Sequence, residues 1–136
     1  PTGVFNLSIT PPEVIEQTHL RMQKHYNPAG GLWKREYMPR TVMLFLNKSS
    51  VKAKEQAQTA WVNYWKAMEK TLDPKKVESA VENTIAGDEQ EVLSKIKEKY
   101  HLEDRLMLWF DFNNHDNDGI KESMRTFIEK IAPRLQ

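Results

Sequence analysis

The fold class is decided by Thr41–Leu46, which reads Thr-Val-Met-Leu-Phe-Leu and is apolar on both faces of an extended chain. A strand that lies in a parallel sheet is covered on both sides and has this character. A second strongly apolar run is Leu106–Phe112, and a third candidate strand, Val4–Ile9, alternates apolar and polar side chains. These three segments predict a sheet of parallel strands.

Helical segments lie between and after these strands, and each begins at a residue suited to capping. Thr10 precedes two prolines, Ser49 or Ser50 precedes a long amphipathic segment, and Asp73 precedes Pro74. Asp88 with Glu91 has the spacing of a capping box. We interpret Gly87 as a break in the chain. Alternation of strands and helices predicts one α/β domain over residues 1–136 with right-handed crossovers.

The last helix carries an apolar stripe that predicts packing against the sheet. Either Asp116 or Asp118 is placed to cap this helix, and we expect Asp118 to do so. Pro133 is expected to end it. The stripe, at helical spacing, consists of Ile120, Met124, Phe127, Ile128 and Ile131.

The composition excludes several classes of protein. The 136 residues include 20 basic and 19 acidic side chains, so there is no basic stripe for nucleic acid. No apolar run approaches the roughly 20 residues that cross a bilayer. With no cysteine, disulfides and thiolate metal sites are excluded. We therefore expect a cytoplasmic protein that binds neither nucleic acid nor membrane.

The segment Asp111–Gly119 is rich in Asp and Asn, which suggests either a calcium loop or a polar turn. Aligned on Gly119, a calcium loop would need a bidentate Glu where the chain has Arg125, so the turn is favoured. The segment follows the end of a strand, which is where functional loops of parallel α/β proteins lie. A functional role for its polar side chains therefore stays open.

The four histidines lack the spacing of a metal site. We expect His19 and His25 to be solvated and His101 to lie in a connection. His115 is the one on a candidate functional loop.

The aromatic residues Trp61, Tyr64 and Trp65 suggest either a flavin-stacking surface or packing within the protein. Their spacing places them on one helix face, which favours packing in the core or between subunits.

Three segments near the C-terminus resemble the luciferase-like flavin-dependent monooxygenases. Ile85–Val92 (Ile-Ala-Gly-Asp-Glu-Gln-Glu-Val) is similar to the Ala-Gly-Thr-Pro-Glu-x-Val segment before the family's final barrel strand. Leu106–Phe112 is similar to that strand, and Lys121–Leu135 to the closing helix, Ser-Met-x-x-Phe-x-x-x-Val-x-Pro. Thr41–Leu46 with Ser49–Gln58 resembles the preceding strand and helix. The resemblance extends over residues 41–135.

This resemblance implies the last three or so strand–helix units of a (β/α)8 TIM-type barrel. A whole barrel needs about 250 residues, so the chain is expected to be the C-terminal portion of one. The family binds reduced flavin mononucleotide (FMN) at the C-terminal face and oxidises an organic substrate with O2. The chain alone is expected to be inactive, because the family's early strands have no counterpart in it.

The resemblance and the strand ends together give a set of candidate site residues. His115 and Asn113 are the predicted catalytic residues, and no metal ligand is predicted. The predicted cofactor-binding residues stand at or after the ends of strands and are Asn6, Ser8, Asn47, Trp109 and Asp111.

Two other hypotheses remain beside the monooxygenase. One is a non-catalytic barrel remnant that serves as a structural or dimerising module. The other is an unrelated small α/β domain. Because an incomplete barrel exposes sheet edges, we expect a homo-oligomer or a protein that needs the missing N-terminal half.

Overall fold

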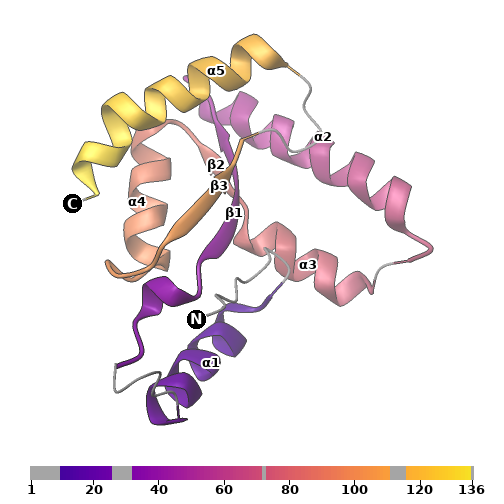
Figure 1. The fold of residues 1–136 in the computed structure, drawn as a ribbon. Coiled ribbons are helices and arrows are strands. Elements are labelled where there is room, and N and C mark those ends of the chain that lie inside the picture. The colour runs from indigo at the N-terminus through magenta and orange to yellow at the C-terminus, as the bar shows by residue number, and fades with distance from the viewer. Residues whose placement is uncertain (1–9, 26–31, 72, 111–115, 136) are drawn as a thin grey trace.

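A sheet of three parallel strands lies at the centre of the fold (Figure 1). The computed structural model describes residues 10–25, 32–71, 73–110 and 116–135. Its strands are β1 (Arg40–Leu46), β2 (Ile85–Gly87) and β3 (Leu106–Trp109), in the order β2-β1-β3. The predicted strand Val4–Ile9 lies outside the described residues.

The central strand, β1, pairs with both others in parallel. Leu44 is in register with Ile85 of β2, and Val42 with Leu108 of β3. The expectation of a parallel α/β fold is therefore confirmed. The sequence did not predict that β1, the first described strand of the chain, would be the central one.

The helices surround this sheet and account for most of the described chain. They are α1 (Pro12–His25), η2 (Arg35–Tyr37), α2 (Ser50–Met68), α3 (Pro74–Asn83), α4 (Glu89–Lys99), α5 (Asn117–Thr126), a π-helical turn η3 (Phe127–Ile131) and η4 (Ala132–Arg134).

Each face of β1 packs against a different pair of helices. Val42, Leu44 and Leu46 belong to a core shared with α4 and with η3, which continues α5. Met43 and Phe45 belong to a second core shared with α2 and α3. The crossover from β1 to β2 and the crossover from β2 back across the sheet to β3 run in opposite directions, so right-handed connections place their helices on opposite faces. This explains why Thr41–Leu46 is apolar on both sides.

The helix caps follow the sequence closely, with one correction. Ser49 accepts from the backbone N–H of Lys52, and Asp73 from that of Lys75. Asp88 and Glu91 form the predicted capping box. Asp116, and not Asp118, caps α5 by accepting from Gly119 N at 3.1 Å. The reason is that α5 already begins at Asn117, so Asp118 lies inside its first turn.

The interpretation of Gly87 as a break was incomplete, because Ile85–Gly87 forms the buried strand β2. Gly87 ends this strand where α4 approaches. An added Cβ there would lie 2.7 Å from the Cβ of Glu91. A side chain at this position would therefore push α4 away from the sheet.

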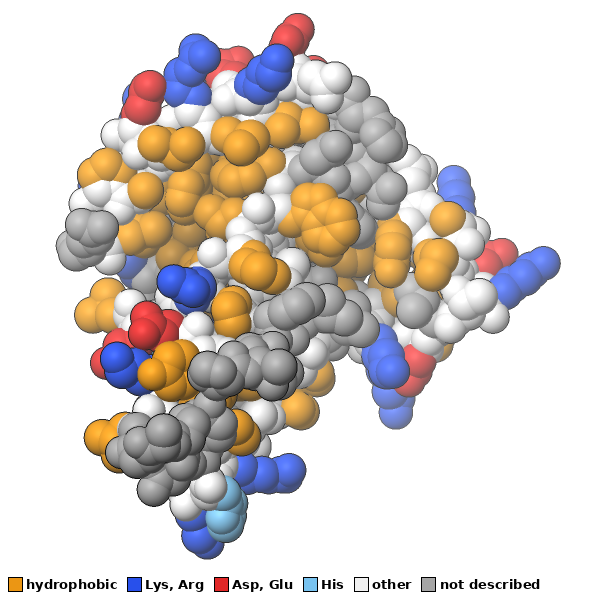
Figure 2. Space-filling view, viewed as in Figure 1, with side chains coloured by type: hydrophobic (Ala, Val, Ile, Leu, Met, Phe, Trp, Pro, Cys, Tyr) orange, Lys and Arg blue, Asp and Glu red, His pale blue; other side chains and the backbone are white. Residues whose placement is uncertain are grey.

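The apolar stripe of the last helix packs only in part. Phe127 and Ile131 are buried, whereas Met124 is 43% and Ile128 64% exposed. Figure 2 shows hydrophobic side chains gathered on the face that carries β3 and α5. On β3, Met107 and Trp109 are also exposed, and within the described residues β3 pairs with β1 alone.

Trp61 is a core residue, as its spacing indicated. Its ring lies edge to face with Tyr64, with centroids 5.5 Å apart, and Nε1 donates to Thr84 Oγ1 at 2.9 Å. The side chain is buried in the core between β1, α2 and α3. The packing interpretation of the aromatic cluster is confirmed for Trp61.

Candidate functional site

A pocket of about 470 Å³ lies at the carboxyl end of β1. Its walls come from the end of β1, the start of α4 and one side of α5, with Gln56 contributed by α2. The apolar lining includes Leu44, Leu46, Phe110 and Ile120. Pockets of this size and mixed lining hold small organic molecules, and in open parallel sheets they lie at the carboxyl ends of strands.

Three side-chain amides line this pocket. The Oδ1 of Asn47 accepts from Ser49 N at 3.0 Å, and its Nδ2 has no hydrogen-bond partner among the described residues. Gln56 and Gln90 also line the pocket, and within the described chain their amides form no side-chain hydrogen bond. An amide presents both donors and acceptors, so these groups suit the N–H and C=O edge of a neutral heteroaromatic ring.

The charged side chains of the pocket are paired with one another or with backbone. Lys48 lies 3.5 Å from Glu122, and Lys130 lies 4.0 Å from Glu89. Asp88 and Asp116 accept from the first turns of α4 and α5. The pocket therefore carries two lysines against four carboxylates, all already engaged.

These residues fit only part of an FMN molecule. The apolar floor and the amides match the ring system. The phosphate does not fit, because the described lining has no cation outside an ion pair with Glu and carries an excess of carboxylates. A phosphate is bound by cationic side chains or by unoccupied backbone N–H groups.

The core that β1 shares with α4 and η3 extends to this pocket. Phe110 lines it and packs edge to face on Phe127, with ring centroids 5.9 Å apart. Ser123 also lines it and donates through Oγ to Leu46 O at 2.8 Å, which ties α5 to the end of β1. The pocket wall is thus continuous with the core.

The structure brings one predicted site residue to the pocket. Asn47 lines it, as expected for a residue that follows a strand. Trp109 does not line the pocket. It is in register with Met43, so the two side chains lie on the same face of the sheet, and Trp109 is 48% exposed. The other predicted site residues lie outside the described part of the chain and are Asn6, Ser8, Asp111, Asn113 and His115.

Sequence reasoning missed the contributions of Gln56, Gln90 and Ser123. Gln90 lies shortly after the end of β2. If β2 had been predicted from the sequence, Gln90 would have been a candidate site residue in the same way as Asn47. Gln56 and Ser123 lie on helices, where no local signal distinguishes them from surface residues.

A second polar cluster lies at the amino end of the sheet, where η2 meets α1. Arg35 donates to both oxygens of Glu16, at 2.6 and 3.0 Å, and through Nε to Asp104 at 2.7 Å. The Asp104 carboxylate also accepts from His101 N and lies 3.7 Å from Arg40. Hydrogen bonds from Arg35 lower the pKa of Glu16 and, against the effect of burial, that of Asp104.

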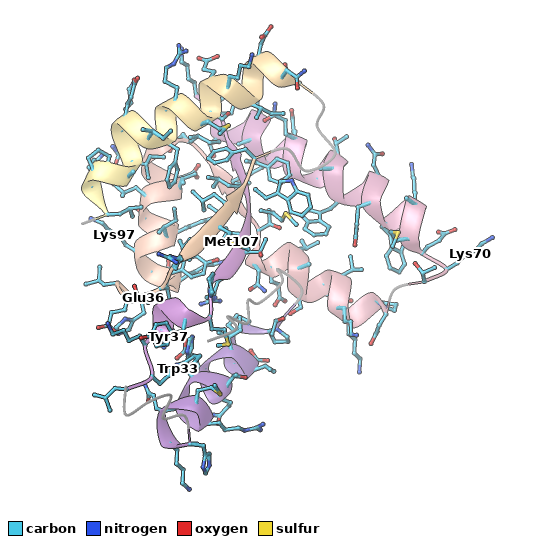
Figure 3. All side chains as sticks on the ribbon, viewed as in Figure 1. Trp33, Glu36, Tyr37, Lys70, Lys97 and Met107 are labelled. Atoms are coloured by element: carbon cyan, nitrogen blue, oxygen red, sulfur yellow. The ribbon has the colours of Figure 1, made fainter. Side chains whose placement is uncertain are left out.

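His19 lies beside this cluster, and the expectation that it is solvated was wrong. It is 1% exposed and accepts at Nδ1 from Trp33 Nε1, at 3.2 Å. Figure 3 shows Trp33 and Tyr37 between η2 and α1, where they cover this side of the helix. The sequence of α1 does not indicate that His19 is buried, because the residues that pack over it, such as Trp33, lie outside the helix. His25 is exposed and His101 lies in the connection between α4 and β3, as expected.

Metal and membrane sites find no support in the part of the chain that the structure describes. There, no group of three or more His, Cys, Asp or Glu side chains is placed to hold a metal ion. None of the described helices has both the length and the apolar character needed to cross a bilayer.

Comparisons with known proteins bear on the fold. No family model matches the sequence, and no curated protein matches it. Among solved structures, the chain is similar to the crystal structure of the monooxygenase RslO1 from Streptomyces bottropensis, with a TM-score of 0.78 and 18% sequence identity. The similarity covers 98% of this chain and 42% of that one. At this identity it shows the fold, which matches part of an α/β barrel.

Proposed function

We propose that this chain forms the C-terminal part of a flavin-dependent monooxygenase of the luciferase-like class. The observation that carries the proposal is the position of the pocket. It opens at the carboxyl end of a parallel strand, in a fold similar over 98% of the chain to a monooxygenase. Active sites of α/β barrels lie at this end of the sheet.

In this proposal the chain contributes the ring-binding side of the active site. Leu44, Leu46 and Phe110 exclude water from a bound flavin ring or organic substrate, and Asn47, Gln56 and Gln90 orient its polar edge. FMN, when bound, supplies the oxygen chemistry, and the protein supplies orientation and a dry cavity. The phosphate-binding residues belong to parts of the enzyme other than the described pocket.

His115, Asn113 and Asp111 are proposed to contact cofactor or substrate from the loop that follows β3. The support for this proposal is that Phe110 and Asp116, the described residues on either side of these positions, both line the pocket. The protein is proposed to be cytoplasmic, with a small organic substrate as its partner.

The test uses the longest reading frame that contains this chain, with reduced FMN supplied by a flavin reductase. We expect tight flavin binding and loss of binding in Gln56→Trp, which fills the pocket from α2. The matched control is Thr59→Trp, an exposed position on the same helix that does not line the pocket. A full-length protein that binds no flavin would rule the proposal out.

A non-catalytic, dimerising module is the alternative, and one observation favours it. Met107, Trp109, Met124 and Ile128 expose apolar surface on and beside β3. Exposed sheet edges recruit other chains. In this case, light scattering would show a dimer of the chain, Met107→Lys would dissociate it, and the full-length protein would bind no flavin.

A further inference from the structure

His19 and Ile15 are the two buried residues of α1, at 1% and 2% exposure. Within the described residues, the helix is therefore attached to the body of the protein by a narrow strip. Outside this strip, Arg35 holds Glu16 and Asn83 Nδ2 donates to Thr10 O at 3.1 Å. A change at His19 thus acts on one of the few buried contacts that hold α1 in place.

The contact with Trp33 fixes the protonation state of His19. An indole N–H can only donate, so the Nδ1 of His19 must be unprotonated to accept it at 3.2 Å. The proton of the neutral ring is then on Nε2. That atom is buried and has no hydrogen-bond partner among the described residues.

The imidazolium form does not fit this arrangement. A proton on Nδ1 would face the N–H of Trp33, so both ring N–H groups would be buried with no acceptor among the described residues. Arg35 of η2 and Arg40 of β1 add repulsion, while Glu16 of α1 and Asp104 attract the charge. Both carboxylates are already hydrogen-bonded to Arg35. Burial is the largest of these effects and lowers the pKa of His19, and the arginines lower it further.

We propose that α1 is a pH-dependent element of the fold, docked while His19 is neutral and released when its imidazole is protonated. This does not depend on the monooxygenase proposal, since the cluster lies at the end of β1 remote from the pocket. The cluster of Arg35, Glu16 and Asp104, beside which His19 lies, is at the amino end of β1, next to Arg40. The pocket opens at the carboxyl end, beside Asn47.

The direction of the pH effect follows from linkage. In the released helix, His19 is solvated and has the ordinary pKa of about 6.5. Docking is therefore complete above that value and weakens as pH falls below it. Between pH 7.5 and 5.5 the docking equilibrium falls about tenfold if the docked form excludes the proton. Glu16 and Asp104 do not titrate in this interval, because Arg35 lowers the pKa of both.

Hydrogen exchange of the whole chain at pH 7.5, 6.5 and 5.5, corrected for intrinsic rates, tests the proposal. We expect the protection of the α1 amides to fall about tenfold, while the α4 amides keep theirs. His25→Asn, an exposed position on the same helix, should behave like the wild type. His19→Asn has an oxygen in place of Nδ1 that accepts from Trp33 without titrating, so its α1 protection should not vary with pH.

Two outcomes of the hydrogen-exchange experiment, and one of a separate titration, would overturn the proposal. One is a wild-type α1 whose protection is the same at pH 5.5 and 7.5. The other is a His19→Asn protein in which α1 protection falls with pH as steeply as in the wild type. In the wild type, an NMR titration of the His19 ring that gives a pKa of 6.5 or above would also contradict it.

Discussion

The two ends of the central strand carry polar side chains that are used in different ways. At the amino end, Arg35, Glu16 and Asp104 pair with one another across segments far apart in sequence. At the carboxyl end, Asp88 and Asp116 are engaged by backbone N–H groups, and a pocket of about 470 Å³ remains. At the amino end the charged side chains bind one another, whereas at the carboxyl end a space and three side-chain amides remain for a ligand.

In the charged cluster at the amino end, the polar groups already serve as partners for one another, so a dense set of charged contacts is not by itself a reason to propose a ligand site. The Arg35 cluster has the shorter ion pairs, at 2.6 and 2.7 Å, yet it closes the interface between η2, α1 and the sheet. The pocket has longer, exposed ion pairs at its rim, such as Lys48 with Glu122. We propose the carboxyl end as the functional end because space remains there beside the end of a parallel strand.

The largest effect is expected where the pocket wall joins the core. Phe127→Ala removes the buried ring that packs on Phe110 and should lower the free energy of unfolding by about 3–5 kcal/mol, measured by urea denaturation. The control, Ile128→Ala, truncates an adjacent side chain that is 64% exposed and should have little effect. Equal losses for both would mean that the stripe packs differently.

At the amino end, Asp104→Asn leaves the largely buried Arg35 without one of its carboxylates. Because the Asp104 side chain is 2% exposed, the free energy of unfolding should fall by about 3 kcal/mol. Glu16→Gln removes the other carboxylate, which is 52% exposed, and should cost less than about 1 kcal/mol. A larger loss for Glu16→Gln would show that solvent does not screen that pair.

A smaller effect is expected from the cap at the carboxyl end. Asp116→Ala removes the acceptor of Gly119 N and should lower the free energy of unfolding by about 1 kcal/mol. Asp118→Ala, inside the first turn, should lower it by less. The reverse order, in thermal melts of the two variants, would make Asp118 the cap.

The smallest effect concerns the capping box of α4. Hydrogen bonds from Ser50, the Asp88 N–H and Lys54 lower the pKa of Glu91 to about 2. Since its folded pKa is depressed, its contribution to stability is present above the ordinary carboxyl value near 4.3 and is lost as pH falls toward 2. The difference in stability between the wild type and Glu91→Gln should therefore shrink as pH falls over that range. Glu98 is exposed on the same helix, and Glu98→Gln should have the same stability as the wild type at both ends of the range.

The sequence predicted the α/β class, the strand Thr41–Leu46 and the caps at Ser49, Asp73 and Asp88, because these depend on residues close in sequence. It did not predict β2, since three residues are too few to show a period. Nor did it predict the strand order, which is set by long-range packing. His19 was misplaced for the same reason, because Trp33 and Arg35 cover a position that looks polar on its own helix.

Of the two predicted site residues that the structure describes, Asn47 lines the pocket and Trp109 does not. A residue that directly follows a buried strand lies at the carboxyl end of the sheet whichever register the strand adopts, as Asn47 does. A residue within a strand faces one side or the other, and the sequence of β3 is apolar on both. The face of Trp109 became evident from its register with Met43.

The central claim, that the ligand site lies at the carboxyl end of the sheet, is tested most directly by an NMR titration of this chain with millimolar FMN. We expect weak binding, because the pocket fits the ring and not the phosphate, with amide shifts confined to residues around Asn47, Gln90 and Ser123. The amides of His19, Arg35 and Asp104 should not move. Shifts that cluster at the amino end, or no shifts at the pocket at any FMN concentration, would contradict the account.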